Sequence, residues 1–299
     1  MMREEGLAQT PREGLVIAHL GQGIAVEHEQ KTYLCQTLRR LETVAVGDKV
    51  IWQPTSPGQG RIEDILPRRS LLARPSRNDK IRPVAANIDH VFVVIAVEPA
   101  CDFLLIDQYL AVCEHNRINV SIVLNKLDLP QSNAIEQELR IYENLGYPVY
   151  RASTITGEGI AELMAVLQNQ VSLFAGQSGV GKSSLTNTII PDIRLRTNTI
   201  SETTKHGRHT TTAATLYHID SDSDLIDSPG VAIFGLADLN GEQLAQGYRE
   251  FEPLLGLCQF NDCRHHQDKG CAVRGAVENG SISSTRYRRF LKLTQKMRH

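Results

Sequence analysis

The chain has 299 residues, which is enough for two or three domains of ordinary size. Its hydrophobic (41%) and charged (22%) fractions exclude an intrinsically disordered chain, and its longest apolar run, 91–97, is too short to span a bilayer. The net charge of −2 is unevenly divided: residues 1–82 carry +3, 83–248 carry −10 and 249–299 carry +5, so we expect any polyanion to meet the two ends. The N-terminus lacks the apolar core of a signal peptide, and we expect a cytoplasmic protein without membrane contact.

Short β-like runs occupy the N-terminal part of the chain. Five of them, from LVIAHL to GRIEDIL, lie within 14–70 and are separated by Gly, Pro and charged turns. This pattern predicts a small closed barrel of the OB-fold type over residues 1–70. The following stretch, 68–82, is basic, contains Pro and has no clear periodicity, so we expect a linker over 71–86.

From Asn87 onward, strand and helix patterns alternate. The runs DHVFVVIAV and NVSIVLNK are typical of buried strands, and the helical pattern FLLIDQYLAVCEHN lies between them. This alternation predicts an α/β domain over 87–236 with a mostly parallel, doubly wound sheet. The remaining segment, 237–299, is expected to be a helical domain that carries a cysteine cluster.

The strongest motif is Gly176–Ser183, which matches GxxxxGK[ST] between a predicted strand and a predicted helix. Glycines let backbone N–H groups surround a triphosphate closely. Lys182 would reach the β- and γ-phosphates, and the Ser183 hydroxyl would bind Mg²⁺. The alternative is a Gly-rich turn that matches by chance, which the flanking strand and helix disfavour.

The motif NKLD at Asn125–Asp128 predicts which base is bound. The Asp128 carboxylate can accept hydrogen bonds from the guanine N1–H and 2-amino groups, and adenine offers neither. Asn125 can bond to the base or to the phosphate loop, and the Lys126 stem can pack along the ring. Ser153 and the residue after it resemble the loop whose backbone N–H contacts guanine O6. The expected GTP-binding residues are Asn125, Lys126, Asp128, Ser153, Thr154, Gly176, Gln177, Ser178, Gly179, Val180, Gly181, Lys182, Ser183 and Ser184.

The order of these motifs is unusual. In most GTPases the phosphate loop comes first, whereas here the base-reading segments precede it and the DSPG segment, 227–230, follows it. This order predicts a circularly permuted GTPase domain, because a sheet does not require a particular entry point. In DSPG, Asp227 would supply a carboxylate to Mg²⁺, and Gly230 would supply an N–H to the γ-phosphate.

A second group of chemistry-bearing residues is Cys258-x4-Cys263-x-His265-x5-Cys271. Three thiolates and one imidazole suit a closed, structural Zn²⁺ site, and soft sulfur ligands select zinc over Mg²⁺ or Ca²⁺. His266 is a rival for the fourth position, and the alternative to a metal site is a loop with reduced cysteines.

Together, these motifs resemble the circularly permuted GTPases of small-ribosomal-subunit biogenesis, the RsgA (YjeQ) type. The resemblance rests on NKLD, GQSGVGKSSL, GRHTTT, LIDSPGV with FGL, and the C-terminal cysteine pattern, and it covers nearly the whole chain. It favours His265 over His266 as the zinc ligand.

The resemblance implies a function. It implies a GTPase that binds the small (30S) ribosomal subunit and its 16S-type rRNA late in assembly, and we expect this GTPase to act as a monomer. Hydrolysis of GTP to GDP would be stimulated by the subunit and would release the protein. Two alternatives are a GTP-controlled signalling switch that acts on a non-ribosomal protein, and a zinc-containing RNA-binding protein in which GTP is only a structural ligand.

The group that orients the attacking water is less evident. Val231 stands where many GTPases carry a Gln, so we expect His209, in GRHTTT, to hold or polarise that water. The alternative is that His209 is a solvent-exposed loop residue. The expected catalytic residues are His209, Lys182 and Gly230, and the expected magnesium ligands are Ser183, Thr211 and Asp227.

The last segment, Arg286–Arg298, contains six Lys or Arg residues and no acid. Its apolar residues lie near helical spacing, which predicts a helix that packs one side and offers the other to phosphates. A merely solvated helix face is the alternative.

Overall fold

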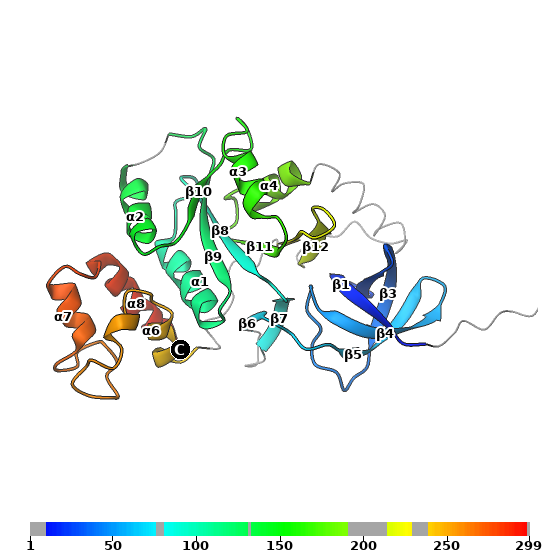
Figure 1. The fold of residues 1–299 in the computed structure, drawn as a ribbon, viewed down its shortest axis with the longest axis horizontal. Helices are drawn as coiled ribbons and strands as arrows, with labels where there is room; N and C mark the ends of the chain where they lie inside the picture. The colour runs from blue at the N-terminus through cyan, green and yellow to red at the C-terminus, as the bar shows by residue number, and fades with distance from the viewer. Residues whose placement is uncertain (1–9, 76–80, 131–132, 191–213, 229–238, 298–299) are drawn as a thin grey trace, which may run out of the picture.

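A computed structural model describes residues 10–75, 81–130, 133–190, 214–228 and 239–297. In this part of the chain a barrel and a helical domain lie at opposite ends of a central α/β domain (Figure 1). No helix among these residues has both the length and the apolar character needed to cross a membrane.

The barrel has five strands in the order β1-β2-β3-β5-β4, and the pairing of β1 with β4 closes it. Only the β3–β5 pair is parallel within this barrel, and the arrangement confirms the predicted OB-like fold. Trp52 is fully buried at its centre, where Gly60 permits close packing because a Cβ there would lie 2.5 Å from the indole ring. The strands are β1 (Arg12–Leu20), β2 (Gly23–His28), β3 (Lys31–Thr37), β4 (Lys49–Ser56) and β5 (Gln59–Ile65).

The segment expected to be a linker contains an antiparallel hairpin, β6 (Leu71–Pro75) and β7 (Ile81–Ala86). A bridge between Val46 and Ala85 attaches this hairpin to the barrel. The buried Asn87 side chain follows it and donates to the Gly47 carbonyl at 2.9 Å. The hairpin is therefore packed against the barrel and does not behave as a free spacer.

The central sheet has the order β10-β9-β8-β11-β13-β12, and all its pairs are parallel except β12 with β13. This confirms the mostly parallel sheet. The edge strand β12 also pairs with β1 of the barrel, so that the two sheets form one of 11 strands. The strands are β8 (His90–Ala96), β9 (Asn119–Asn125), β10 (Val149–Arg151), β11 (Val171–Ala175), β12 (Thr215–His218) and β13 (Asp224–Asp227).

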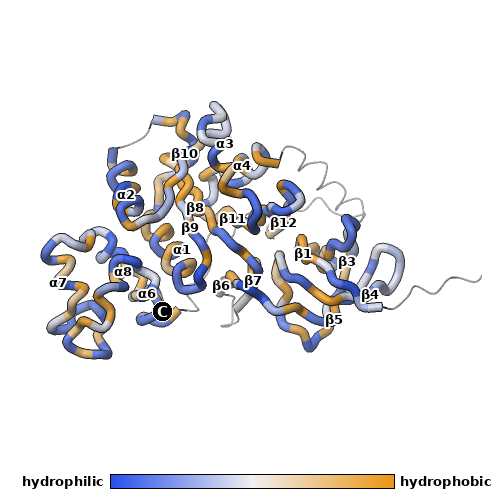
Figure 2. The backbone as a smooth tube through the Cα atoms, in the orientation of Figure 1, coloured by the Kyte–Doolittle hydropathy of each residue, from blue (hydrophilic) through white to orange (hydrophobic). Residues whose placement is uncertain are grey.

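Helices cover both faces of this sheet. Alternate residues of β8 belong to two separate cores: Val93 packs in the core that includes α1 and α2, and Val94 in the core that includes α3 and α4. The central strands are consequently rich in hydrophobic residues, shown in orange in Figure 2, with polar residues mainly at their ends. The helices are α1 (Phe103–His115), α2 (Asn133–Asn144), α3 (Ile160–Val166) and α4 (Lys182–Ile189).

The C-terminal domain packs on α1. Gly247 makes the close approach possible, because a Cβ at this position would lie 2.6 Å from the Ala111 carbonyl oxygen. The rings of Tyr248 and Phe251 stack beside this contact, and the Phe290 ring meets both edge to face, at centroid distances of 5.0–5.3 Å. The elements are α6 (Gly241–Gln246), η2 (Glu252–Leu254), α7 (Ala272–Glu278) and α8 (Ser284–Lys296).

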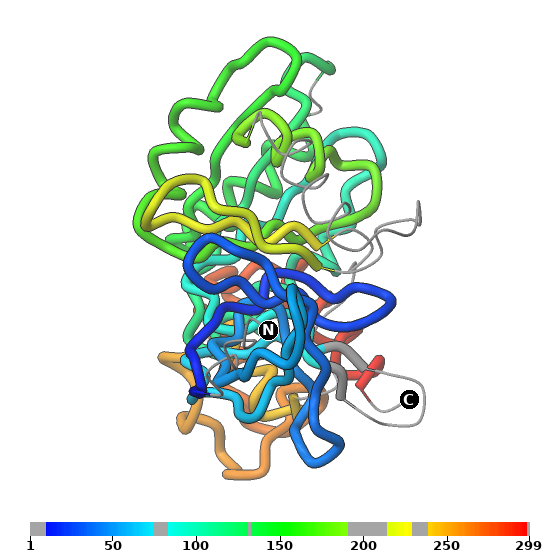
Figure 3. The backbone as a smooth tube through the Cα atoms, turned by 90° about the vertical axis from the view of Figure 1, so that its right-hand side faces the viewer, coloured from blue at the N-terminus to red at the C-terminus, as the bar shows by residue number. Residues whose placement is uncertain are grey.

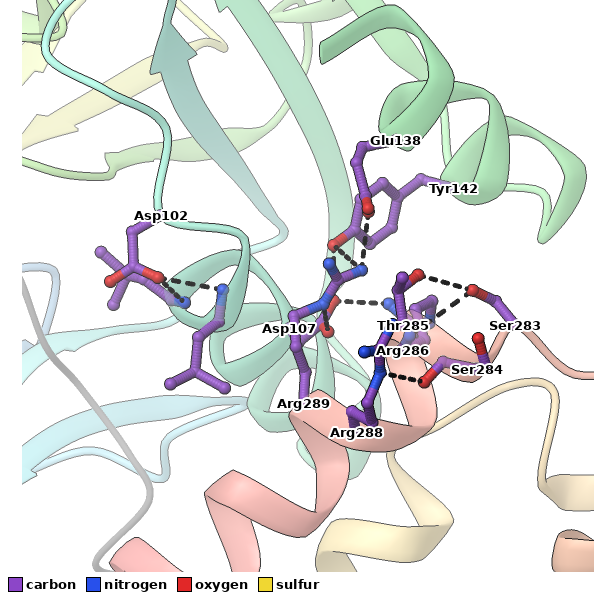
Figure 4. A network of polar contacts seen from close by, with 12 residues as sticks. Asp102, Asp107, Glu138, Tyr142, Ser283, Ser284, Thr285, Arg286, Arg288 and Arg289 are labelled. Atoms are coloured by element: carbon purple, nitrogen blue, oxygen red, sulfur yellow. Dashed lines mark hydrogen bonds and ion pairs between the residues drawn. The ribbon is translucent and has the colours of Figure 1, made fainter. Parts of the chain in front are cut away.

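A buried ion network joins α8 to α1 (Figure 4). The fully buried Asp107 of α1 accepts from Arg286 Nη1 at 2.7 Å and from Arg289 Nε at 2.6 Å. Glu250 and Glu138 pair with the same two guanidinium groups, at 2.5 and 2.9 Å. Two of the six basic residues therefore face the α/β domain and not a phosphate.

The exposed basic residues of α8 are Arg288, Lys292 and Lys296, which are four residues apart. That spacing places them on one face of the helix. The exposed basic surface of α8 is thus smaller than the six basic residues of the sequence suggest.

We expect Asp107→Ala to lower the free energy of unfolding by about 3–5 kcal/mol, because it removes the fully buried carboxylate that Arg286 and Arg289 share. Urea unfolding followed by circular dichroism measures this loss. The control is Glu278→Ala, which removes an exposed i,i+4 pair with Arg274 and should cost less than about 1 kcal/mol. Equal losses in the two variants would show that the network does not stabilise the domain contact.

Candidate nucleotide and metal sites

The predicted nucleotide-binding residues lie at the carboxyl ends of parallel strands. Asn125 ends β9, Ser153 follows β10 by two residues, the phosphate loop follows β11, and Asp227 ends β13. Because parallel strands direct these ends to the same edge of the sheet, segments far apart in the chain meet there. The permuted order of the motifs does not disturb this arrangement.

The phosphate loop passes closely over the central strand β8. Gly176 has φ +135°, and a Cβ there would lie 2.1 Å from the Val94 carbonyl oxygen. Lys182 begins α4, and its Nζ donates to the Gly176 and Gln177 carbonyls at 2.8 and 2.7 Å. Burial lowers the pKa of this ammonium. The loop thus holds a cation inside its curve at a helix N-terminus, which suits a phosphate.

Hydrogen bonds connect the base-reading segments to one another and to the loop. Asn125 donates from Nδ2 to the Val180 carbonyl at 2.9 Å, while its buried Oδ1 has no partner among the described residues. Gly181 is required for this contact, because a Cβ there would lie 2.3 Å from Asn125 Nδ2. Ser153 donates to Asp128 at 2.6 Å, which orients the carboxylate.

Several expected ligands lie at the rim of this site. Lys126 has φ +62° and donates from Nζ to the Glu98 carbonyl at 2.8 Å, and Thr154 is half-buried. Gln177 accepts from the Asp102 amide at 3.2 Å, which connects the loop to the start of α1. This contact is not predictable from local sequence patterns, because its partners are 75 positions apart. Exposed members of the expected set are Asp128, Ser178, Gly179, Ser183 and Ser184.

Asp227 and Ser183 form a candidate magnesium site. Ser183 Oγ lies 3.5 Å from Asp227 Oδ2, and the buried Oδ1 of Asp227 has no partner among the described residues. Burial raises the pKa of this carboxyl group. Mg²⁺ binds through one or two carboxylates and phosphate oxygens, so an orphaned carboxylate oxygen beside the phosphate loop fits it. The expected residues His209, Thr211 and Gly230 lie outside the described residues.

The four predicted metal ligands come together. His265 Nδ1 lies 3.6 Å from the Sγ atoms of Cys258 and Cys263 and 3.5 Å from that of Cys271. In a tetrahedral zinc site with usual bond lengths, nitrogen and sulfur ligands are about 3.6 Å apart. The donor set and its spacing therefore fit Zn²⁺, and His265, not His266, completes the cluster among the described residues.

The surrounding backbone and side chains hold these ligands in place. Cys258 Sγ accepts from the Ala272 amide at 3.4 Å, and Cys271, the N-cap of α7, accepts from the Arg274 amide at 3.4 Å. Tyr287 of α8 donates to the His265 carbonyl at 2.7 Å. Such contacts orient the ligands toward a common centre.

A metal that binds at this cluster has to displace protons from its thiols. Burial and the neighbouring Cys258 and Cys271 thiols raise the pKa of Cys263 to about 12. Burial lowers the pKa of His265, so its imidazole is neutral and can donate a lone pair. A bound dication would hold the thiols as thiolates, which offsets the cost of their burial.

Known proteins share these features. The RsgA GTPase family matches residues 65–237. "Small ribosomal subunit biogenesis GTPase RsgA" of Haemophilus influenzae (strain PittGG) is 44% identical over 96% of this chain and 85% of its own length. "Small ribosomal subunit biogenesis GTPase RsgA 1" of Vibrio vulnificus (strain YJ016) is 43% identical over 98% of this chain and 86% of its own.

Two solved structures resemble the whole chain. YjeQ from Thermotoga maritima superposes with a TM-score of 0.75 and 33% identity, covering 96% of this chain and 99% of that one. YloQ, a circularly permuted GTPase, gives a TM-score of 0.72 at 27% identity, covering 99% and 98%. These similarities confirm the predicted permuted GTPase fold with its barrel and C-terminal domain.

Proposed function

This chain belongs to the RsgA GTPase family, and from that premise we propose that it hydrolyses GTP on the small (30S) ribosomal subunit during late assembly. The observation that carries the proposal is 44% identity over 96% of the chain to a relative named for small-subunit biogenesis. The assembled edge of the sheet, where Asn125 contacts the phosphate loop, supports nucleotide binding. No observation favours a signalling switch with a non-ribosomal partner.

We assign the following roles at the nucleotide site. Asp128, oriented by Ser153, accepts from guanine, and Lys182 neutralises phosphate charge. Ser183 and Asp227, with Thr211, would hold Mg²⁺, which supplies further neutralisation of the β- and γ-phosphates. The remaining proposed roles are a Gly230 N–H bond to the γ-phosphate and a water held by His209. We further propose four parts of the chain: the barrel (1–70), the connecting segment (71–86), the GTPase domain (87–236) and the zinc domain (237–299).

We also propose that a monomer acts in the cytoplasm and contacts 16S-type rRNA through its two ends. The segments 1–82 and 249–299 carry net charges of +3 and +5, while the middle carries −10. On α8 the exposed Arg288, Lys292 and Lys296 are available for phosphates.

Guanine specificity is expected to depend on Asp128. Asp128→Asn exchanges an acceptor for a group that can donate, so binding should shift from GTP towards xanthosine triphosphate, whose 2-oxo group accepts a hydrogen bond. Competition with a fluorescent nucleotide measures both affinities. A variant that still prefers GTP would show that another residue reads the base.

We expect one Zn²⁺ per chain, held by Cys258, Cys263, His265 and Cys271. Because structural zinc contributes folding free energy, Cys263→Ser should lose the metal and unfold the C-terminal domain first. Metal analysis and hydrogen exchange of α7 check the two parts. The control is His266→Ala, which should keep the metal, and freshly purified protein without zinc would contradict the assignment.

The function is tested by a GTPase assay with purified small subunits. Subunits should raise turnover strongly, whereas a signalling switch would keep its slow intrinsic rate and a structural nucleotide would not turn over at all.

In the same assay, His209→Ala should lower turnover roughly 100-fold with little change in GTP affinity, because a positioned acid–base group contributes about that factor. The variant should also remain bound to subunits with GTP. If His209→Ala hydrolyses GTP at the wild-type rate, other groups orient the attacking water.

A further inference from the structure

The edge strand β12 lies between the barrel and the candidate magnesium site. Thr215, its first residue, is opposite Ala18 of β1 on one side and opposite Asp227 of β13 on the other. Figure 3 shows the β12–β13 hairpin, in yellow, directly beside the blue barrel strands. A single strand therefore separates the barrel from the carboxylate that would bind magnesium.

The other end of β12 is held by a second contact with the barrel. His218 pairs with Asp224 of β13 through Nδ1 at 2.6 Å and with Glu27 of β2 through Nε2 at 2.9 Å. Both ring nitrogens face carboxylates, and the hydrogen bonds to Asp224 and Glu27 raise the pKa of His218 to about 10. At neutral pH the ring is thus an imidazolium that joins three strands.

This contact has little value as a source of stability. The His218 side chain is 36% exposed, and exposed ion pairs contribute only about 0–1 kcal/mol. The contact is more important for the position of β12. This strand has four residues and pairs with β1 of the barrel at a single position, Ala18. Glu27 therefore supplies a charged contact between the barrel and the far end of this short strand.

We propose that Glu27 and His218 are positioning residues for GTP hydrolysis, through which the barrel fixes β12 against β13 and so places Asp227. The inference rests on the proposed role of Asp227 as a magnesium ligand. It makes the barrel, which contributes no residue to the assigned nucleotide site, part of the machinery that sets the rate of hydrolysis.

The test measures intrinsic hydrolysis, without ribosomal subunits, by Glu27→Gln, His218→Gln and the double variant. Each single variant should lower kcat about five- to tenfold, a modest coupling between sites, with KM for GTP within about twofold. Both variants remove the Glu27–His218 pair, and His218→Gln also removes the pair with Asp224, so the double variant should be no slower than His218→Gln alone. His28→Gln is the matched control, since this neighbouring histidine bonds to the Glu13 carbonyl within the barrel and should leave kcat unchanged.

Hydrogen exchange separates positioning from general destabilisation. In Glu27→Gln, peptides that cover β12 and β13 should exchange faster while those that cover β8 and α8 keep the wild-type rate. Wild-type kcat with wild-type exchange in β12 would overturn the proposal, as would faster exchange throughout the protein. Failure of subunits to stimulate the wild-type enzyme would contradict the proposed ribosomal function and leave this result unaffected.

Discussion

Parallel pairing of β10, β9, β8, β11 and β13 is the constraint on which the nucleotide site depends. It directs the ends of these strands to one edge, where Asn125 reaches the Val180 carbonyl across 55 positions of sequence. Because the pairing depends on strand order in the sheet and not in the chain, the site forms although its motifs are permuted. The barrel pairs with β12 at one edge of this sheet, and the C-terminal domain packs on α1, which covers one face.

The sequence indicated most of the features that depend on local patterns. Strand periodicity, the phosphate loop and the cysteine spacing each follow from neighbouring residues, and the barrel, the parallel sheet and the Cys₃His cluster are present in the structure. Contacts between distant segments were not predictable in the same way. Asp107 lies in an apolar helix, and nothing near it in sequence indicates that its partner Arg286 is 179 positions away. For that reason α8 was expected to be more accessible to phosphates than it is.

The positions of β12 and of the β6–β7 hairpin also depend on contacts between distant segments. β12 has only four residues, and its antiparallel pairing with β13 and β1 is a tertiary choice that its own pattern does not specify. The sequence predicts a linker over 71–86 because basic residues and Pro mask the alternation of β6 and β7. Its position is instead decided by the bridge from Val46 to Ala85 and by the Asn87 side chain.

The contact of α8 with α1 also determines how the molecule can be divided. A GTPase domain cut before α6 would expose Asp107 and the Tyr142 ring, on which the Arg286 guanidinium lies 5.1 Å from the ring centroid. It would also uncover the face of α1 on which Gly247 and the surrounding aromatic rings pack. The C-terminal helices are thus part of the hydrophobic core of the α/β domain, and the smallest unit that keeps this core out of water includes both.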